Sequence, residues 1–180
     1  MFNIFNPFTT DESSSWEASY KIPLQLNFQT ESLNNIRIGD PLEKLRAFGR
    51  PDKGQPFKQG RFEYYLLGLE VEGEHGRIIN FMFMVNPQKD RVTKHFLYTR
   101  IEESPSEFAN CELTLIAANG RQLNIQRSTN LKDVEQILGV APEKEFAGRY
   151  CENSIYQQGG LTPFFVWLED GTIEEIIVEQ

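Results

Sequence analysis

Cysteine and histidine are scarce in this sequence of 180 residues, which contains two of each. Because Cys111 and Cys151 are the two cysteines, a small disulfide-stabilised fold is excluded; we expect two reduced thiols, although one bridge between them stays open. Neither His75 nor His95 has a second ligand at the spacing of an HExxH or CxxC motif. We therefore expect no metal ion.

Motifs for covalent catalysis and for nucleotide binding are missing as well. The sequence has no GxSxG nucleophile elbow and no GxGxxG or GxxxxGK phosphate loop. The adjacent Glu174 and Glu175 would point to opposite faces of a strand, so this pair cannot supply both a general acid and a general base. We expect no catalytic residue and no cofactor; a hydrolase stays open only because Glu169 and Glu174 could face one cleft.

Positive charge is in short supply. The 18 Lys and Arg residues against 26 Asp and Glu leave a net charge of -8 and a pI of about 4.9. This balance opposes nonspecific binding to nucleic acid or to an anionic membrane, because both need a positive field. The deficit lies mostly in residues 87–180, with 9 basic and 15 acidic side chains. An acidic protein of this kind favours a basic protein partner.

Long apolar runs are also absent. No stretch is long enough for a membrane span, and no Lys or Arg precedes Lys21, as a signal peptide would require. We therefore expect a soluble, cytoplasmic protein without membrane contact. What the sequence has instead is 39% hydrophobic and 12% aromatic residues, 14 of them Phe, which suits a substantial core.

Four short segments of the first half have counterparts in the second half, in the same order. The best example is QLNFQ against QLNIQ. The four pairs of segments are 25–29 with 122–126, 40–51 with 130–142, 62–71 with 154–166, and 76–85 with 171–180. Such internal similarity predicts two similar units. They would span 20–101, including a linker strand at 91–101, and 102–180, after an N-terminal tail at 1–19.

Each unit is predicted to contain one short α-helix, at 40–48 and at 130–138. Asp40 and Asn130 can cap the first turns, and Gly49 and Gly139 can end the helices in a left-handed conformation. Apolar residues at three- and four-residue spacing give each helix one face that a sheet must cover. These residues are Leu42, Leu45 and Phe48 in the first helix and Leu131, Val134 and Leu138 in the second.

Two dipeptides predict tight hairpin turns between strands, Asn119-Gly120 and Asp170-Gly171. If the second is a two-residue turn, Trp167 pairs with Glu174 in the final hairpin. The core face then carries Phe164, Val166, Leu168, Ile173 and Ile177. The opposite face carries Phe165, Trp167, Glu169, Glu174 and Ile176.

The second of these faces is unusual, because large rings flanked by carboxylates stand where a solvated face would be polar. The strand at 76–85 is similar, since Ile78, Met82 and Met84 alternate with other apolar residues. A sheet that is apolar on both sides is either covered or used for binding. We include Tyr65 and Tyr156 with this face as candidate binding residues.

The repeated plan resembles the small helix-plus-sheet unit of the outer-membrane assembly lipoproteins, and in tandem it is similar to the beta-lactamase inhibitor protein fold. The resemblance is carried by Ile38-Gly39, Leu45, Phe48-Gly49, Pro51 and Tyr65, and by Val134, Leu138-Gly139, Pro142 and Tyr156. It implies a non-catalytic protein that binds other proteins across a concave sheet face rich in aromatics and acids. The chain has no lipobox cysteine, so membrane anchoring does not carry over.

Together these observations predict an α+β protein of two helix-plus-antiparallel-sheet units in tandem. The expected function is that of a soluble protein-binding module, such as an inhibitor or immunity-type protein that caps a basic partner. One alternative is a small-molecule binder or hydrolase with a pocket between the units, holding Tyr65, Tyr156 and Glu169. Another is a structural subunit of a homo-oligomer, such as a homodimer, which buries the same rings.

Overall fold

The computed structural model describes most of the chain. The described residues are 16–17, 23–52, 60–70, 75–86, 88–103, 112–126, 129–140, 142, 144–147, 151–156 and 158–179. For 65–70, 75–78, 100–103, 144–147, 151–153 and 179 the description is of the backbone alone. Outside the described residues lie most of the predicted N-terminal tail, residues 104–110, Cys111, and the side chains of Tyr65 and Cys151.

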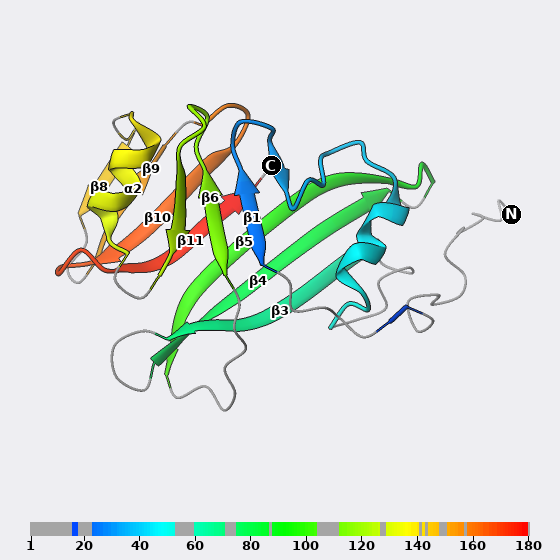
Figure 1. The fold of residues 1–180 in the computed structure, drawn as a ribbon, viewed down its shortest axis with the longest axis horizontal. Coiled ribbons are helices and arrows are strands. Elements are labelled where there is room, and N and C mark those ends of the chain that lie inside the picture. Colours follow the sequence, from blue (N-terminus) through cyan, green and yellow to red (C-terminus); the bar gives the residue numbers. More distant parts are fainter. Residues whose placement is uncertain are drawn as a thin grey trace, which may run out of the picture.

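A seven-stranded antiparallel sheet forms the larger layer of the molecule (Figure 1). In spatial order its strands are β3 (Arg61–Glu70), β4 (His75–Asn86), β5 (Arg91–Glu103), β11 (Ile173–Glu179), β10 (Thr162–Leu168), β9 (Cys151–Ile155) and β8 (Lys144–Ala147). The two halves of the chain meet at the centre of this sheet, where β5 pairs with β11. The sheet is therefore continuous through the linker strand.

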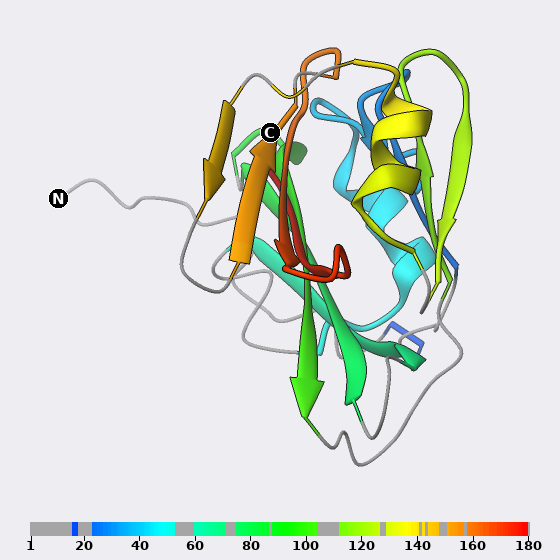
Figure 2. The same cartoon turned by 90° about the vertical axis from the view of Figure 1, so that its left-hand side faces the viewer.

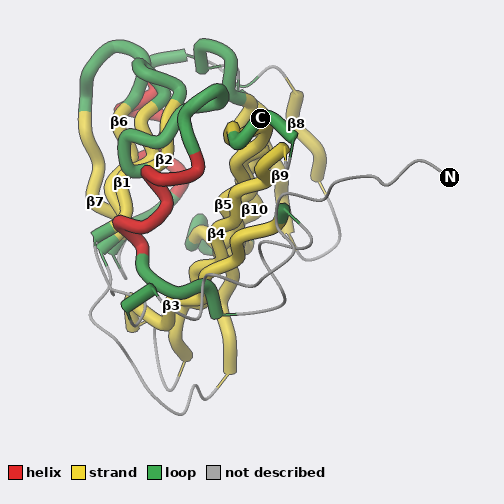
Figure 3. The backbone as a smooth tube through the Cα atoms, turned by 90° about the vertical axis from the view of Figure 1, so that its right-hand side faces the viewer, coloured by secondary structure: helices red, strands yellow, loops and turns green. Residues whose placement is uncertain are grey.

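A second layer covers one face of this sheet, as Figure 2 shows in a view along the layers. Its four-stranded mixed sheet has the order β2 (Ser32–Leu33), β1 (Leu24–Asn27), β6 (Leu113–Ile116) and β7 (Gln122–Ile125). The central pair, β1 and β6, is parallel and again joins the two halves of the chain. The 3-10 helix η2 (Leu42–Phe48) and the helix α2 (Leu131–Leu138) flank this sheet at its two ends (Figures 1 and 3).

The predicted α+β class, with two helix-plus-sheet units in tandem, is wrong. Strands dominate the described chain, and each of the two sheets takes strands from both halves. The matched segments are not equivalent either, because QLNFQ forms the first strand of one hairpin and QLNIQ the second strand of another. Among the described residues, neither helix is long and apolar enough to span a membrane.

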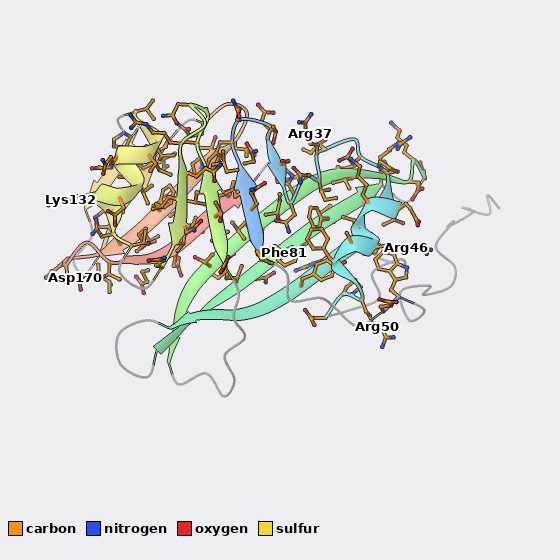
Figure 4. The ribbon with its side chains drawn as sticks, viewed as in Figure 1. Arg37, Arg46, Arg50, Phe81, Lys132 and Asp170 are labelled. Carbon is orange, nitrogen blue, oxygen red and sulfur yellow. The ribbon has the colours of Figure 1, made fainter. Side chains whose placement is uncertain are left out.

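Only one of the two predicted helices is an α-helix. Helix α2 has the predicted cap: the Asn130 side chain accepts from the backbone N–H groups of Lys132 and Asp133, and Gly139 ends the helix with φ of 68°. The segment 42–48 is a 3-10 helix whose N-cap is Pro41, which has no capping side chain, and the Asp40 carboxylate accepts from the N–H of Arg37. Figure 4 places Lys132 at the α2 end of the molecule.

Aromatic rings fill the space between η2 and the seven-stranded sheet. The Phe48 ring lies 5.1 to 5.4 Å, centroid to centroid, from the rings of Tyr64, Phe81 and Phe83. All four side chains are at most 1% exposed. In Figure 4, Phe81 lies beside η2. Aromatic pairs at this separation stabilise a core beyond their area of burial.

The two layers are also tied together by the turn between β9 and β10. The Gly160 N–H donates to the Glu31 carboxylate over 2.6 Å, and the Gln158 side chain accepts from the N–H of Ala118 over 3.0 Å. A Cβ at Gly160 would lie only 2.7 to 2.8 Å from that carboxylate, so glycine permits the close approach. The turn therefore fixes β10 relative to the four-stranded sheet.

The final hairpin exists as predicted, but its turn is longer by one residue. The N–H of Leu168 donates to Thr172 O, and Gly171 adopts φ of 85°, which makes a three-residue loop with glycine in the left-handed position. Trp167 consequently pairs with Ile173 instead of Glu174. Glu174 is the extra residue of a β-bulge, and beyond it the pairing returns to the predicted register, with Phe165 opposite Ile176.

The predicted assignment of the two faces of this hairpin is wrong for Phe164, Leu168 and Ile177, which are half-buried. Val166 and Ile173 are buried as predicted, but the covered face is otherwise the opposite one. Phe165, Ile176 and Val178 are fully buried, and Trp167 is 5% exposed, whereas Phe164 is half-buried. The physical reason is that the predicted core face would also carry Glu175, the cross-strand partner of Val166. Burying a carboxylate is costly, and the carboxylates of the chosen face stay out of the core, because Glu169 is exposed in the turn and Glu174 is half-buried at the bulge.

We predict that Trp167→Ala lowers the free energy of unfolding by about 3 to 5 kcal/mol, because it removes a buried indole and leaves a cavity. Phe164→Ala, on the half-buried side of the same strand, should cost clearly less. Chemical denaturation of the two variants measures the difference. Equal midpoints for Trp167→Ala and the wild type would contradict the assignment of Trp167 to the core face.

Candidate functional site

Four of the seven side chains that were predicted to bind a partner are buried in the core. The placements are Phe165, Tyr156 and Ile176 fully buried, Trp167 5% exposed, Glu174 half-buried, Glu169 exposed, and Tyr65 described by its backbone alone. The structure therefore does not bring these seven residues together on one surface. In particular, buried rings cannot meet a partner while the sheet keeps its cover.

The predicted pocket around Tyr65, Tyr156 and Glu169 also has no support among the described residues. Tyr156 packs edge-on against Phe165 in the core, with ring centroids 5.7 Å apart, and its hydroxyl donates to Glu135 Oε1 over 3.4 Å. Glu169 is exposed in the turn between β10 and β11. Tyr156 and Glu169 thus lie in different environments, one inside the protein and one in solvent.

A different apolar surface exists on the side of the seven-stranded sheet that faces away from the second layer. We call it the outer face. One row crosses five neighbouring strands, each residue directly opposite the next in register: Asn80, Tyr98, Ile177, Phe164 and Ile155. All five side chains are half-buried, while their neighbours along the strands are buried in the core. The row gives the sheet a second apolar side.

A small pocket lies next to this row, over β4 and β5. Its volume is about 190 Å³, and it is lined by Met82, Met84, Lys94, His95 and Phe96. Met82 lies opposite Phe96, and Met84 opposite Lys94, so these four residues share the outer face. Methionine suits a surface that adapts to different partners, because its unbranched thioether chain repacks easily.

Charged groups on the outer face are held by specific partners. The Tyr98 hydroxyl donates to Glu175 Oε1 over 2.7 Å, which joins β5 to β11. On β3, Arg61 forms an ion pair with Glu63 at 3.0 Å, and Asn80 Nδ2 also donates to Glu63 at 3.2 Å. These contacts fix the carboxylates at the rim of the apolar surface, so a partner would meet an ordered polar border.

His95 lies below the pocket, with its side chain on the core side of β5, opposite Phe83. It is 1% exposed, and neither ring nitrogen has a hydrogen-bond partner in the described part of the chain. Burial lowers the pKa of His95 to about 4, and the Glu31 carboxylate offsets a part of this effect. The imidazole is therefore neutral at pH 7.

The described residues offer little for metal chemistry. No group of three or more His, Cys, Asp or Glu side chains among them is placed to hold a metal ion. What the outer face can do is bury apolar surface against another molecule, with Tyr98, Glu175 and Arg61 at its border for polar contacts.

The sequence pattern around Met82 and Met84 already signals a second apolar side, but Phe96, Tyr98, Phe164 and Ile177 were missed as members of it. No local signal separates the two faces at Phe164, because the sequence places Glu175 on one face and Glu169 and Glu174 on the other. In the strand 91–103, apolar and polar residues alternate too irregularly to assign its two faces, because a bulge between Met84 and Val85 shifts its register against β4.

No protein-family model matches the chain, and no curated protein matches it significantly. Among solved structures, the chain is similar to the crystal structure of a DUF4309 family protein, YjgB, from Bacillus subtilis. The identity is 12%, and the match covers 96% of this chain and 92% of that chain with a TM-score of 0.39.

We predict that His95 makes the stability depend on pH. Its folded pKa of about 4 lies below the unfolded value of 6.5, so the unfolded chain binds the proton first as the pH falls. The contribution of neutral His95 to the free energy of unfolding is intact above about pH 6.5 and declines as the pH falls toward 4. It amounts to about 3 kcal/mol in total.

The measurement is the free energy of unfolding from pH 7 to pH 4, for the wild type and for His95→Leu. The carboxylates titrate in both proteins, so the difference between the two curves isolates His95. The wild type should lose about 3 kcal/mol more than the variant over this range. Parallel curves would contradict the prediction.

Proposed function

We propose that this chain is a non-catalytic protein-binding module and that the outer face of its seven-stranded sheet is the binding surface. The observation that carries the proposal is the half-buried apolar row from Tyr98 through Ile177 and Phe164 to Ile155, continued by Met82 and Phe96. Contiguous apolar surface of this kind, bordered by polar groups, is typical of protein interaction sites. An inhibitor or immunity-type protein would use such a face to cap its partner.

The size of the pocket favours a protein over a small molecule. At about 190 Å³ it is smaller than the roughly 300 to 1,000 Å³ of most small-molecule sites. A pocket of this size suits one large apolar side chain of a partner, which is the usual form of an interface anchor. Met82, Met84 and Phe96 would surround that side chain, and Lys94 would lie at the edge.

The charge of the chain bears on the choice of partner. A net charge of -8 attracts a basic protein over a long range and repels an acidic one. Such steering raises the rate of encounter, while the buried apolar contacts supply most of the affinity. The proposed partner is therefore a basic protein that presents a large apolar side chain.

We predict that Phe96→Glu abolishes specific binding while the fold persists, because the half-buried ring lies on the outer face beside the pocket. The experiment compares immobilised wild type and Phe96→Glu for capture from native lysate, quantified by isotope-labelled mass spectrometry. Gln136→Glu is the matched control, because it adds the same charge at an exposed position of α2, which belongs to the covering layer.

A captured protein counts as the partner only if the wild type and Gln136→Glu retain it and Phe96→Glu loses it. For that protein, Phe96→Ala should weaken binding by roughly 2 kcal/mol or more, as central aromatic anchors do. If all three immobilised proteins capture the same set, the outer face is not the binding surface.

A further inference from the structure

The two edges of the seven-stranded sheet differ in how they are protected. At one edge, β8 has only four residues, and two of them, Lys144 and Glu145, are charged. At the other edge, β3 has ten residues, and it contains neither Lys nor Pro. Short length, charge and proline are the devices that keep a free edge from pairing with another strand. Strand β3 lacks most of them.

Among the described residues, two local features protect the ends of β3, and neither reaches its middle. Near the start, the N–H of Asp52 donates to Glu63 O over 2.9 Å. Near the end, a bulge between Gly68 and Glu70 interrupts the regular pairing with β4. Between them, the sequence from Tyr64 to Leu69 carries no charged residue.

The backbone groups of Tyr65 and Leu67 point away from the sheet. Glu63 O is turned toward Asp52 and thus away from β4, and in an antiparallel pair every second residue has this orientation. Tyr65 and Leu67 follow Glu63 by two and four positions, before the bulge. No backbone hydrogen bond from the described part of the chain reaches their outward N–H and C=O groups.

We propose that this edge pairs with the same edge of a second copy of the chain, antiparallel and about a twofold axis at Leu66. Tyr65 then lies opposite Leu67 of the partner subunit, and Leu67 lies opposite Tyr65 of the partner subunit. Each of these pairs has its groups turned to the other strand, so it exchanges both backbone hydrogen bonds. The contact is isologous, as in most homodimers.

A second copy fits this edge for two reasons. Identical strands have the same alternation, so the register about Leu66 places core-facing positions of one copy beside core-facing positions of the other. The paired stretch is also free of charge on both strands, so two chains of net charge -8 meet where their own repulsion is least.

The pairing joins both large sheets into one, with the two outer faces on the same side. Because the paired stretch is short, the dimer belongs to the weak, concentration-dependent class. This inference rests on the backbone of β3 and holds whether or not the outer face binds another protein.

Sedimentation velocity over a wide range of concentration tests the proposal. The wild type should shift from the monomer mass of 20.8 kDa toward twice that mass as the concentration rises. Leu67→Pro should stay monomeric, because proline removes the outward N–H without breaking a bond to β4. Leu67→Ala is the matched control, since it keeps that N–H and should still dimerise.

Hydrogen exchange of the wild type gives a second readout that needs no variant. Protection of the amides of Tyr65 and Leu67 should fall on dilution, while the amides of β11 at the centre of the sheet should not change. A wild type that is monomeric throughout, or a dimer that Leu67→Pro does not weaken, would overturn the proposal. So would a dimer whose β3 amides exchange at the same rate after dilution.

Discussion

Among the described residues, the second layer covers one face of the seven-stranded sheet, and the rest of this structure depends on this constraint. Side chains along a strand alternate between faces, so one covered face divides every strand into buried and outward positions. The aromatic rings around Phe48 fill the covered side, and the tie between Glu31 and Gly160 holds the second layer in place. The opposite side is left with Met82, Phe96 and Phe164.

Local features of the fold could be predicted from the sequence where a short-range interaction decides them. The cap at Asn130 and the stop at Gly139 mark the two ends of α2, and Asn119 and Arg121 add hydrogen bonds to its last carbonyl groups. In η2, by contrast, Leu42, Leu45 and Phe48 recur at a strict spacing of three, which is the period of a 3-10 helix and not of an α-helix. That spacing is present in the sequence and predicts a 3-10 helix at this position.

For the candidate site, the sequence predicted the type of surface, a sheet face that is apolar where a solvated face would be polar, but not most of its residues. Phe164 and Ile177 were missed although their pairing was predicted correctly, because the second layer decides which face of the hairpin is covered, and its strands come from distant parts of the sequence. The pairing of β5 with β11 also joins segments far apart in the sequence, as the bond from Tyr98 to Glu175 shows. Local patterns carry no information on such long-range neighbours, and the prediction of tandem units failed for the same reason.

Hydroxyl-radical footprinting, resolved to single residues by mass spectrometry, tests the central claim most directly. The claim is that the outer face is the accessible apolar side of the sheet. The face that was predicted to bind a partner, with Phe165 and Trp167, is instead part of the core. In the native protein, Met82, Met84 and Phe164 should be modified readily, while Phe165 and Trp167 should react only after unfolding. Rapid modification of Trp167 in the native state, with Phe164 protected, would contradict the account.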